Sequence, residues 1–118
     1  MKFTRLMPLL RTRNLEQAVA FYRDRLGFEC TQQTSDWVFV ERDDITLMIA
    51  LPNAHEPFDR PCFTGSLYFS TDDVDQLWRA VKDHTEIVYP LEDFDYAMRE
   101  FAIRDSNGYC LQFGKEMG

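Results

Sequence analysis

The stretch Asn14-Leu15-Glu16-Gln17 decides the fold, because its pattern returns about 60 residues later as Asp73-Val74-Asp75-Gln76. Each copy begins with a residue type that caps helices and places a glutamine three positions later. At this spacing two side chains can satisfy the free amides at the start of a helix. Both stretches therefore predict the beginning of a helix. The apolar stripe after the first one predicts a helix that ends at Gly27.

The segments on either side of the two predicted helices also correspond. A strand over residues 3–10 precedes the first helix, and residues 66–70 form the matching strand before the second. The strands that close the two copies are expected over residues 46–51 and 109–114. A chain of 118 residues is long enough for one compact domain and too short for two independent ones. We therefore expect a single domain over residues 1–118, built from two modules.

The module boundaries follow from this repeat. Module one is expected over about residues 3–51, the linker over 52–64 and module two over about 65–116. Each module is expected to end in a hairpin. In the first, two strands over residues 37–42 and 45–51 flank the acidic turn Asp43-Asp44. In the second, strands begin at Ile87-Val88-Tyr89, and the last hairpin turns at Asp105-Ser106-Asn107-Gly108.

Charge is distributed unevenly along the chain, which has a net charge of −7. Residues 31–98 hold four Lys or Arg against fourteen Asp or Glu, a local net charge of −10. Such a segment repels nucleic acids and anionic membranes and favours cations. No apolar run approaches the length of a membrane span, and the basic start of the chain lacks the apolar core of a signal peptide. We therefore expect a cytoplasmic protein without a nucleic-acid or membrane partner.

The cysteines and histidines do not form a recognisable site. Cys30, Cys62 and Cys110 are odd in number and lack CxxC spacing, so we expect free thiols rather than a disulfide framework or a zinc site. His55 lies in the linker and His84 follows the second helix, so both are expected at the surface.

Two motifs resemble signatures of one known superfamily. The run Ala20-Phe21-Tyr22-Arg23-Asp24-Arg25-Leu26-Gly27-Phe28-Glu29 resembles the helix signature of the glyoxalase, bleomycin-resistance and extradiol dioxygenase proteins, also called vicinal oxygen chelate proteins. The run from Arg99 to Tyr109 resembles their second signature, with Ser106 in place of the usual proline. The resemblance implies an α+β fold in which two βαβββ modules form a curved mixed sheet. This agrees with the repeat.

Enzymes of this superfamily hold a metal ion at four positions with His, Glu or Gln. Alignment on the two signatures places Met7, Ala50, Ser66 and Gln112 at these positions. Only Gln112 is a plausible ligand for a hard divalent ion, because Met is soft, Ala has no donor atom and a neutral Ser hydroxyl is weak. The resemblance therefore implies no metal and no other cofactor, and we expect no catalytic residue.

The bleomycin-resistance proteins are the subgroup that this chain resembles most. The resemblance implies a homodimer whose N-terminal arms exchange at Pro8, with ligand grooves at the subunit interface. Drugs of the bleomycin type have a flat aromatic part and a cationic tail, so a protein that binds them requires aromatic faces and carboxylates. The expected ligand-binding residues are the aromatic Trp37, Phe39, Tyr68 and Tyr96, the acidic Asp59, Asp93 and Asp95, and Gln112.

Strand alternation leaves the placement of two of these residues open. It puts Trp37 and Phe39 on one face of a strand and Val38 and Val40 on the other, without indicating which face meets the ligand.

Three functions remain compatible with the sequence. The first is a homodimeric, metal-free protein that sequesters a small cationic or aromatic molecule, such as an antibiotic of the bleomycin type. The second is a metal-dependent lyase, isomerase or dioxygenase of the same superfamily with a shifted site. The third is a sensor that binds an unrelated metabolite. Metal analysis separates the second from the first, and ligand screening separates the third.

Overall fold

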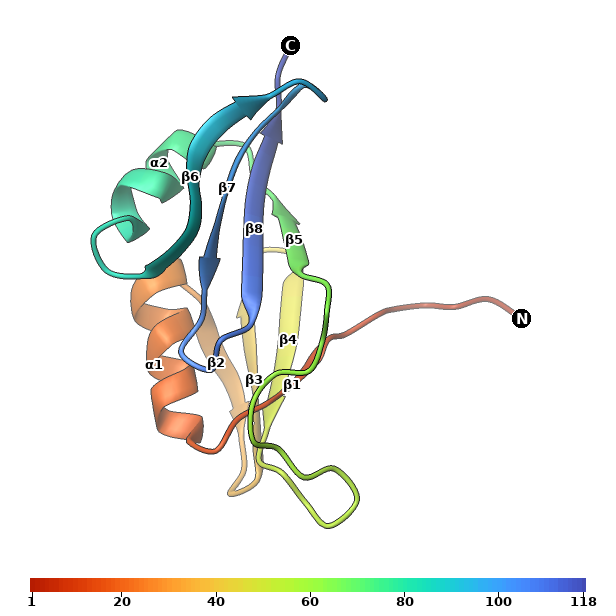
Figure 1. The fold of residues 1–118 in the computed structure, drawn as a ribbon. Coiled ribbons are helices and arrows are strands. Elements are labelled where there is room, and N and C mark those ends of the chain that lie inside the picture. Colours follow the sequence, from red (N-terminus) through yellow and green to blue (C-terminus); the bar gives the residue numbers. More distant parts are fainter. The chain divides into compact units, whose positions relative to one another are not determined.

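The computed structural model describes residues 1–118, which form two compact units, Met1–Asp59 and Arg60–Gly118. The boundary between the units falls within the linker expected over residues 52–64. Figure 1 shows one helix and one sheet in each unit, and the two units are described separately below. Neither helix is long and apolar enough to cross a membrane.

Both units have the same order of elements and the same strand pairing. The first contains β1 (Leu9–Arg11), α1 (Leu15–Leu26), β2 (Glu29–Gln33), β3 (Trp37–Arg42) and β4 (Ile45–Ala50). The second contains β5 (Leu67–Ser70), α2 (Val74–Val81), β6 (Glu86–Phe94), β7 (Met98–Arg104) and β8 (Cys110–Glu116). The sheet orders are β1-β4-β3-β2 and β5-β8-β7-β6, and in each sheet only the first pair is parallel. The expected α+β fold with two βαβββ modules is confirmed.

The helix signals in the sequence act as expected. The Asn14 side chain accepts a hydrogen bond from the Gln17 amide at 2.9 Å, and Asp73 accepts from the Gln76 amide at 3.0 Å. Helix α1 ends at Gly27, which has a φ of 72° and donates its amide to the Arg23 carbonyl at 3.1 Å. A glycine is suited to this left-handed conformation because it has no Cβ.

Each sheet buries the face that its own helix covers. In the first unit, Val38, Val40, Leu47 and Ile49 are each 1% exposed and lie on the side of α1. In the second unit, the buried residues Phe101, Ile103, Leu111 and Phe113 lie on the side of α2, and the Trp78 ring is 5.1 Å from the Phe101 ring. Trp78 on α2 therefore packs towards the core of its unit. We call the opposite side of each sheet its helix-free face.

The first strand is shorter than the sequence predicted. A strand was expected over residues 3–10, but β1 covers only Leu9–Arg11, and that expectation was wrong for residues 3–8. Pro8 has no amide to donate, although its carbonyl accepts a hydrogen bond from the Met48 amide at 3.0 Å. Residues before it find no strand partner in their own unit, and Phe3 and Leu6 are 90% and 86% exposed. Figure 1 shows this segment extended.

Strand β6 continues through Pro90, further than the three residues named for its start. One register shift occurs between Ile87 and Tyr89, before the proline, and a second between Tyr89 and Glu92 spans it. Because β6 is an edge strand, these irregularities accommodate a residue that cannot donate to the sheet.

Candidate ligand-binding faces

The helix-free face of the first unit has an aromatic and apolar centre, and Glu41 follows Phe39 on the same face of β3. Trp37 and Phe39 lie on it, with ring centroids 4.9 Å apart and an interplanar angle of 39°. In register, Ala50 lies opposite Trp37 and Met48 opposite Phe39. Alternation left open which side these aromatics take, and the structure places them on the side away from α1. Half-exposed aromatic rings of this kind offer a surface on which a planar ligand can stack.

The helix-free face of the second unit is polar and centres on a buried carboxylate. Glu100 on β7 is 2% exposed and accepts hydrogen bonds from three tyrosine hydroxyls. Tyr68 donates to Oε2 at 2.5 Å, Tyr89 donates to Oε1 at 3.1 Å, and Tyr96 donates to Oε1 as well. A buried carboxylate is costly unless donors satisfy it, and these hydroxyls do so.

Two further side chains extend this arrangement. The Ser66 hydroxyl donates to Gln112 Oε1, and Gln112 Nε2 donates to the Tyr89 hydroxyl at 2.7 Å. Tyr89 in turn donates to Glu100, so the hydrogen bonds run in one direction towards the carboxylate. We call these six residues the Glu100 network: Ser66, Tyr68, Tyr89, Tyr96, Glu100 and Gln112.

Strand register and one glycine bring the network together. Gln112 on β8 lies opposite Tyr68 on β5, and Glu100 on β7 lies opposite Gly114 on β8. A Cβ added at Gly114 would lie 1.9 Å from the Tyr68 hydroxyl oxygen. The absence of a side chain at Gly114 thus allows Tyr68 to reach over the strand to Glu100.

Tyr96 reaches Glu100 from the turn between β6 and β7. The next residue, Ala97, has a φ of 65°, in the left-handed region where glycine is favoured. The Tyr96 ring stacks on Phe94 with centroids 5.3 Å apart and an interplanar angle of 17°. This stacking and the turn together hold the phenol over the carboxylate.

Burial and the hydrogen bonds to Glu100 together raise the pKa values of the three phenols. The hydrogen bond to Glu100 is the main cause that raises the pKa of Tyr96 to about 12. Burial is the main cause that raises the pKa of Tyr68, with the hydrogen bond to Glu100 second, and burial also raises the pKa of Tyr89. At neutral pH all three hydroxyls therefore act as donors to Glu100.

The three acidic residues expected at the ligand lie outside the Glu100 network. Asp93 accepts from Arg99 at 2.6 and 3.0 Å, and this guanidinium lowers the pKa of Asp93. Asp59 pairs with Arg13 at 3.1 Å. Asp95 is exposed in the turn beside Tyr96. The buried charge on the polar face comes instead from Glu100.

Sequence reasoning did not assign Glu100 or Tyr89 to the candidate site. Consecutive strand residues point to opposite faces, so Arg99 meets Asp93 and Asp75 while Glu100 meets the tyrosines. The available signal was a glutamate that directly precedes the buried Phe101 in a strand otherwise rich in apolar residues.

The residues expected at the superfamily's metal positions are poor ligands for a divalent ion. Ala50 has no donor atom, and the side chains of Ser66 and Gln112 are hydrogen-bonded to each other. Met7 offers only a thioether, which is a soft ligand. No group of three or more His, Cys, Asp or Glu side chains is arranged to hold a metal ion.

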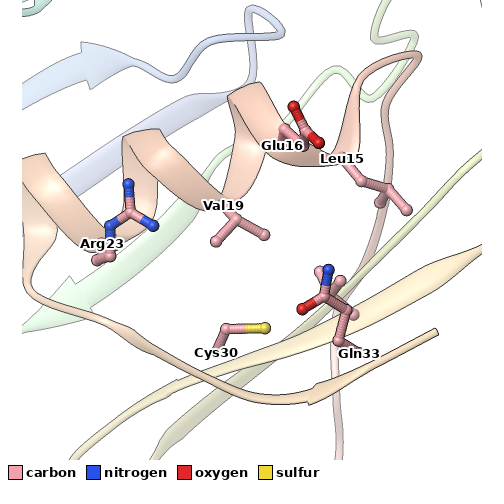
Figure 2. A pocket seen from close by; sticks show the side chains of 7 residues that line it. Leu15, Glu16, Val19, Arg23, Cys30 and Gln33 are labelled. Atoms are coloured by element: carbon pink, nitrogen blue, oxygen red, sulfur yellow. The ribbon is translucent and has the colours of Figure 1, made fainter. Parts of the chain in front are cut away.

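A separate pocket of about 370 Å³ lies on the helix side of the first unit. Figure 2 shows side chains of α1 facing Cys30 and Gln33 of β2 across it. Its lining residues are Leu15, Glu16, Val19, Arg23, Cys30, Gln33 and Val38. Cys30 is a free thiol, as are Cys62 and Cys110. None of the residues expected to bind ligand lines this pocket.

Comparison with known proteins identifies the family. Residues 3–113 match the model of the Glyoxalase/Bleomycin resistance protein/Dioxygenase superfamily. No curated protein sequence matches this chain. Among solved structures, a glyoxalase/bleomycin resistance protein/dioxygenase from Nocardioides has a TM-score of 0.83 at 16% identity, covering 99% of this chain and 85% of that one.

Two further structures show the same fold with different named activities. A bleomycin resistance determinant encoded on the transposon Tn5 has a TM-score of 0.78 at 21% identity, covering 97% of this chain and 98% of that one. A lactoylglutathione lyase from Agrobacterium tumefaciens has a TM-score of 0.71 at 21% identity, covering 95% and 92%. The duplicated βαβββ fold and the family match over residues 3–113 agree, and the chain belongs to the Glyoxalase/Bleomycin resistance protein/Dioxygenase superfamily.

Proposed function

We propose that this protein binds a small aromatic or cationic molecule and sequesters it without a metal ion and without chemical conversion, as bleomycin-resistance proteins do. The observation that carries the proposal is the hydrogen bond between Ser66 and Gln112. These side chains occupy two of the superfamily's metal positions and satisfy each other, and Ala50 at a third position has no donor atom. A metal would have to break this bond to gain two weak neutral ligands.

The two helix-free faces support binding in different ways. The Trp37 and Phe39 pair offers an apolar surface for a planar group. The exposed rings of Tyr68 and Tyr96 offer further aromatic surface, with Gln112 in the same network. Asp59, Asp93 and Asp95 remain candidates only for weaker contacts, since Asp59 and Asp93 are already paired with arginines.

The N-terminal segment supports a homodimer as the binding unit. Met1, Phe3 and Leu6 are almost fully exposed, and the segment joins the sheet only from Pro8 onwards. Exposed apolar side chains on an extended segment are typical of an interaction site. We propose that this arm exchanges at Pro8 with a second copy of the chain. Sedimentation of the protein with and without residues 2–7 tests this, and a monomer in both cases would contradict it.

Calorimetric titration of chelator-treated protein with metal-free and copper-loaded bleomycin tests the function. We expect one drug per chain with a Kd of about micromolar or tighter, which corresponds to about −8 kcal/mol. Trp37→Ala should weaken binding roughly tenfold, because it removes a stacking surface. Trp78→Phe is the matched control, since Trp78 packs on Phe101 under α2. No heat at millimolar drug would overturn the proposal for this drug class.

Metal analysis tests the competing reading, a metal-dependent lyase, isomerase or dioxygenase. The protein as purified is dialysed and assayed for Ni, Zn, Mn and Fe. We expect less than about one-tenth of an equivalent of each, because the family positions lack suitable donors. A tightly held, stoichiometric ion would contradict the metal-free proposal and favour an enzyme.

A further inference from the structure

We propose that the Glu100 network selects a ligand with a cationic nitrogen, an ammonium or guanidinium group, whose N–H donors meet the Tyr68 and Tyr96 oxygens. This inference rests on the proposed function, because it names the chemical class that one of the two binding faces accepts. Four observations support it: the direction of the hydrogen bonds, the charge of the face, the exposure of the tyrosines and the position of their rings.

The direction of the hydrogen bonds determines what the tyrosines can offer. A carboxylate only accepts, so the single hydroxyl proton of each of the three tyrosines points towards Glu100. The lone pairs of Tyr68 and Tyr96 then remain for a ligand. A carbonyl, carboxylate or phosphate would place its own lone pairs against them, whereas an N–H group would complete the arrangement.

The charge of this face lacks a protein counter-ion. No Lys or Arg forms an ion pair with Glu100, and Arg99, the residue next to it, pairs with Asp75 and Asp93 on the opposite side. Glu92, which is exposed, lies opposite Glu100 in the register of β6 and β7 and adds a second negative charge. A buried carboxylate with only neutral donors is stabilised further when a cation approaches.

Exposure shows how a ligand would meet the network. Glu100 is 2% exposed, whereas Tyr68 and Tyr96 are 43% and 54% exposed. A ligand therefore contacts phenol oxygens and rings, and the carboxylate acts from behind them. The Tyr96 ring, held against Phe94, also presents an aromatic face to which a cation is attracted. Phenol rings around a negative charge suit an alkylammonium group better than a neutral one of equal size.

The test compares two probes of nearly equal shape, 4-phenylbutylamine and 4-phenyl-1-butanol, at neutral pH in 0.15 M NaCl. Binding is followed by amide chemical shifts of ¹⁵N-labelled protein. We expect the amine to bind roughly tenfold more tightly than the alcohol, with the largest shifts around Tyr96 and Glu100. Glu100→Gln should bring the two affinities within about twofold of each other. Asp83→Asn is the control, because Asp83 is exposed and loses the same charge.

Tyr96→Phe keeps the test decisive if Glu100→Gln fails to fold. It removes the hydroxyl of a half-exposed tyrosine and keeps the ring, so we expect a folded protein in which the amine loses at least half of its advantage over the alcohol. Equal affinity of the two probes for the unaltered protein would overturn this inference and leave the proposed function standing. So would bleomycin binding with no response to either probe. Failure of both probes and of bleomycin would overturn the inference and the proposed function together.

Discussion

The two helix-free faces have the same strand arrangement and different chemistry at their centres. In the first unit, β3 and β4 present the uncharged Trp37, Phe39 and Met48 there, and the one carboxylate that β3 adds to this face, Glu41, lies beyond Phe39. In the second unit, β7 and β8 present Glu100 and Gln112 within a hydrogen-bonded network. The helix sides do not diverge in this way. Both are apolar and buried.

This difference shows which side of a duplicated module is constrained by packing. The helix side must fill the space under α1 or α2, and large losses follow when a buried apolar residue is changed. No helix packs on the helix-free side, so its side chains can change without loss of core packing. One copy can therefore become a stacking surface and the other a polar network on a shared backbone pattern.

The largest expected effect comes from filling the space above Gly114, through which Tyr68 reaches Glu100. In Gly114→Ala the new Cβ would lie 1.9 Å from the Tyr68 oxygen, so Tyr68 must leave Glu100. We expect the free energy of unfolding to fall by roughly 1–3 kcal/mol, from overpacking and a lost hydrogen bond to a buried charge. Urea titration followed by tryptophan fluorescence measures it.

A double-mutant cycle identifies the cause of that loss. In a Tyr68→Ala background, Gly114→Ala should cost much less, because the clash is gone. Gly118→Ala is the control, since a Cβ added at Gly118 would meet no heavy atom within 4 Å. If Gly114→Ala costs the same with and without the tyrosine, Gly114 has another role and the comparison of the two faces loses one of its supports.

The next largest effect is expected at alkaline pH, which should weaken the helix-free face of the second unit and not that of the first, because only the second contains tyrosines. Folding raises the pKa of Tyr96 from 10.0 to about 12, so the protonated phenol is favoured in the folded state. The resulting stability is fully present below pH 10 and is lost as the pH rises towards 12. We therefore expect unfolding midpoints to drop over this interval.

Glu100→Gln sharpens this test. The hydrogen bond to Glu100 is the main cause of the shift at Tyr96, whereas burial is the main cause at Tyr68. The variant should therefore lower the pKa of Tyr96 more than the pKa of Tyr68. ¹³Cζ chemical shifts of the tyrosines measure both. An equal fall at both positions would contradict the ranking of causes.

The sequence predicted the repeat and most of the helix and strand positions, because these depend on local signals. Asn14 and Asp73 marked both helix starts, and Gly27 marked the end of α1. The prediction failed at residues 3–8, where correspondence with the second module suggested a strand but no partner lies within the unit. A strand requires a neighbour, and local sequence does not show one.

The candidate site was predicted less completely. Tyr68, Tyr96 and Gln112 do lie together in the Glu100 network. Glu100 and Tyr89 were missed, because their roles arise from register between strands that are distant in sequence and from the space above Gly114. Asp93 was expected to meet a ligand and instead meets Arg99, since one residue of shift along a strand exchanges the faces.

The two units can be compared by the stability that each loses when its N-cap residue is removed. Asn14→Ala and Asp73→Ala each remove an acceptor from a helix start, at a cost of about 1 kcal/mol. Asp73 also carries a charge that interacts favourably with the helix dipole, and α2 has 8 residues against 12 in α1. We expect Asp73→Ala to cost a few tenths of a kcal/mol more. The swaps Asn14→Asp and Asp73→Asn are controls. A larger cost at Asn14 would contradict the argument.

The smallest effect is expected for Arg99→Gln, which changes the side of β7 that faces α2 and leaves the Glu100 network intact. Arg99 pairs with Asp93 and Asp75, but its side chain is 40% exposed. Exposed ion pairs contribute little to the free energy of unfolding. The midpoint of unfolding should fall less than with either cap variant, and less still in high salt.

The dependence of stability on acid pH shows whether the Arg99–Asp93 ion pair stabilises the folded protein. Arg99 lowers the pKa of Asp93, so the stability it adds is present above the ordinary aspartate pKa and is lost as the pH falls through the lowered value. Arg99→Gln should flatten the acid side of the stability profile, whereas Arg104→Gln, which breaks the exposed pair with Glu86, is the control on the same strand. The preference for 4-phenylbutylamine over the alcohol should survive Arg99→Gln. If it vanished, the two sides of β7 would not act separately, and the contrast between a packing side and a ligand side would fail in this unit.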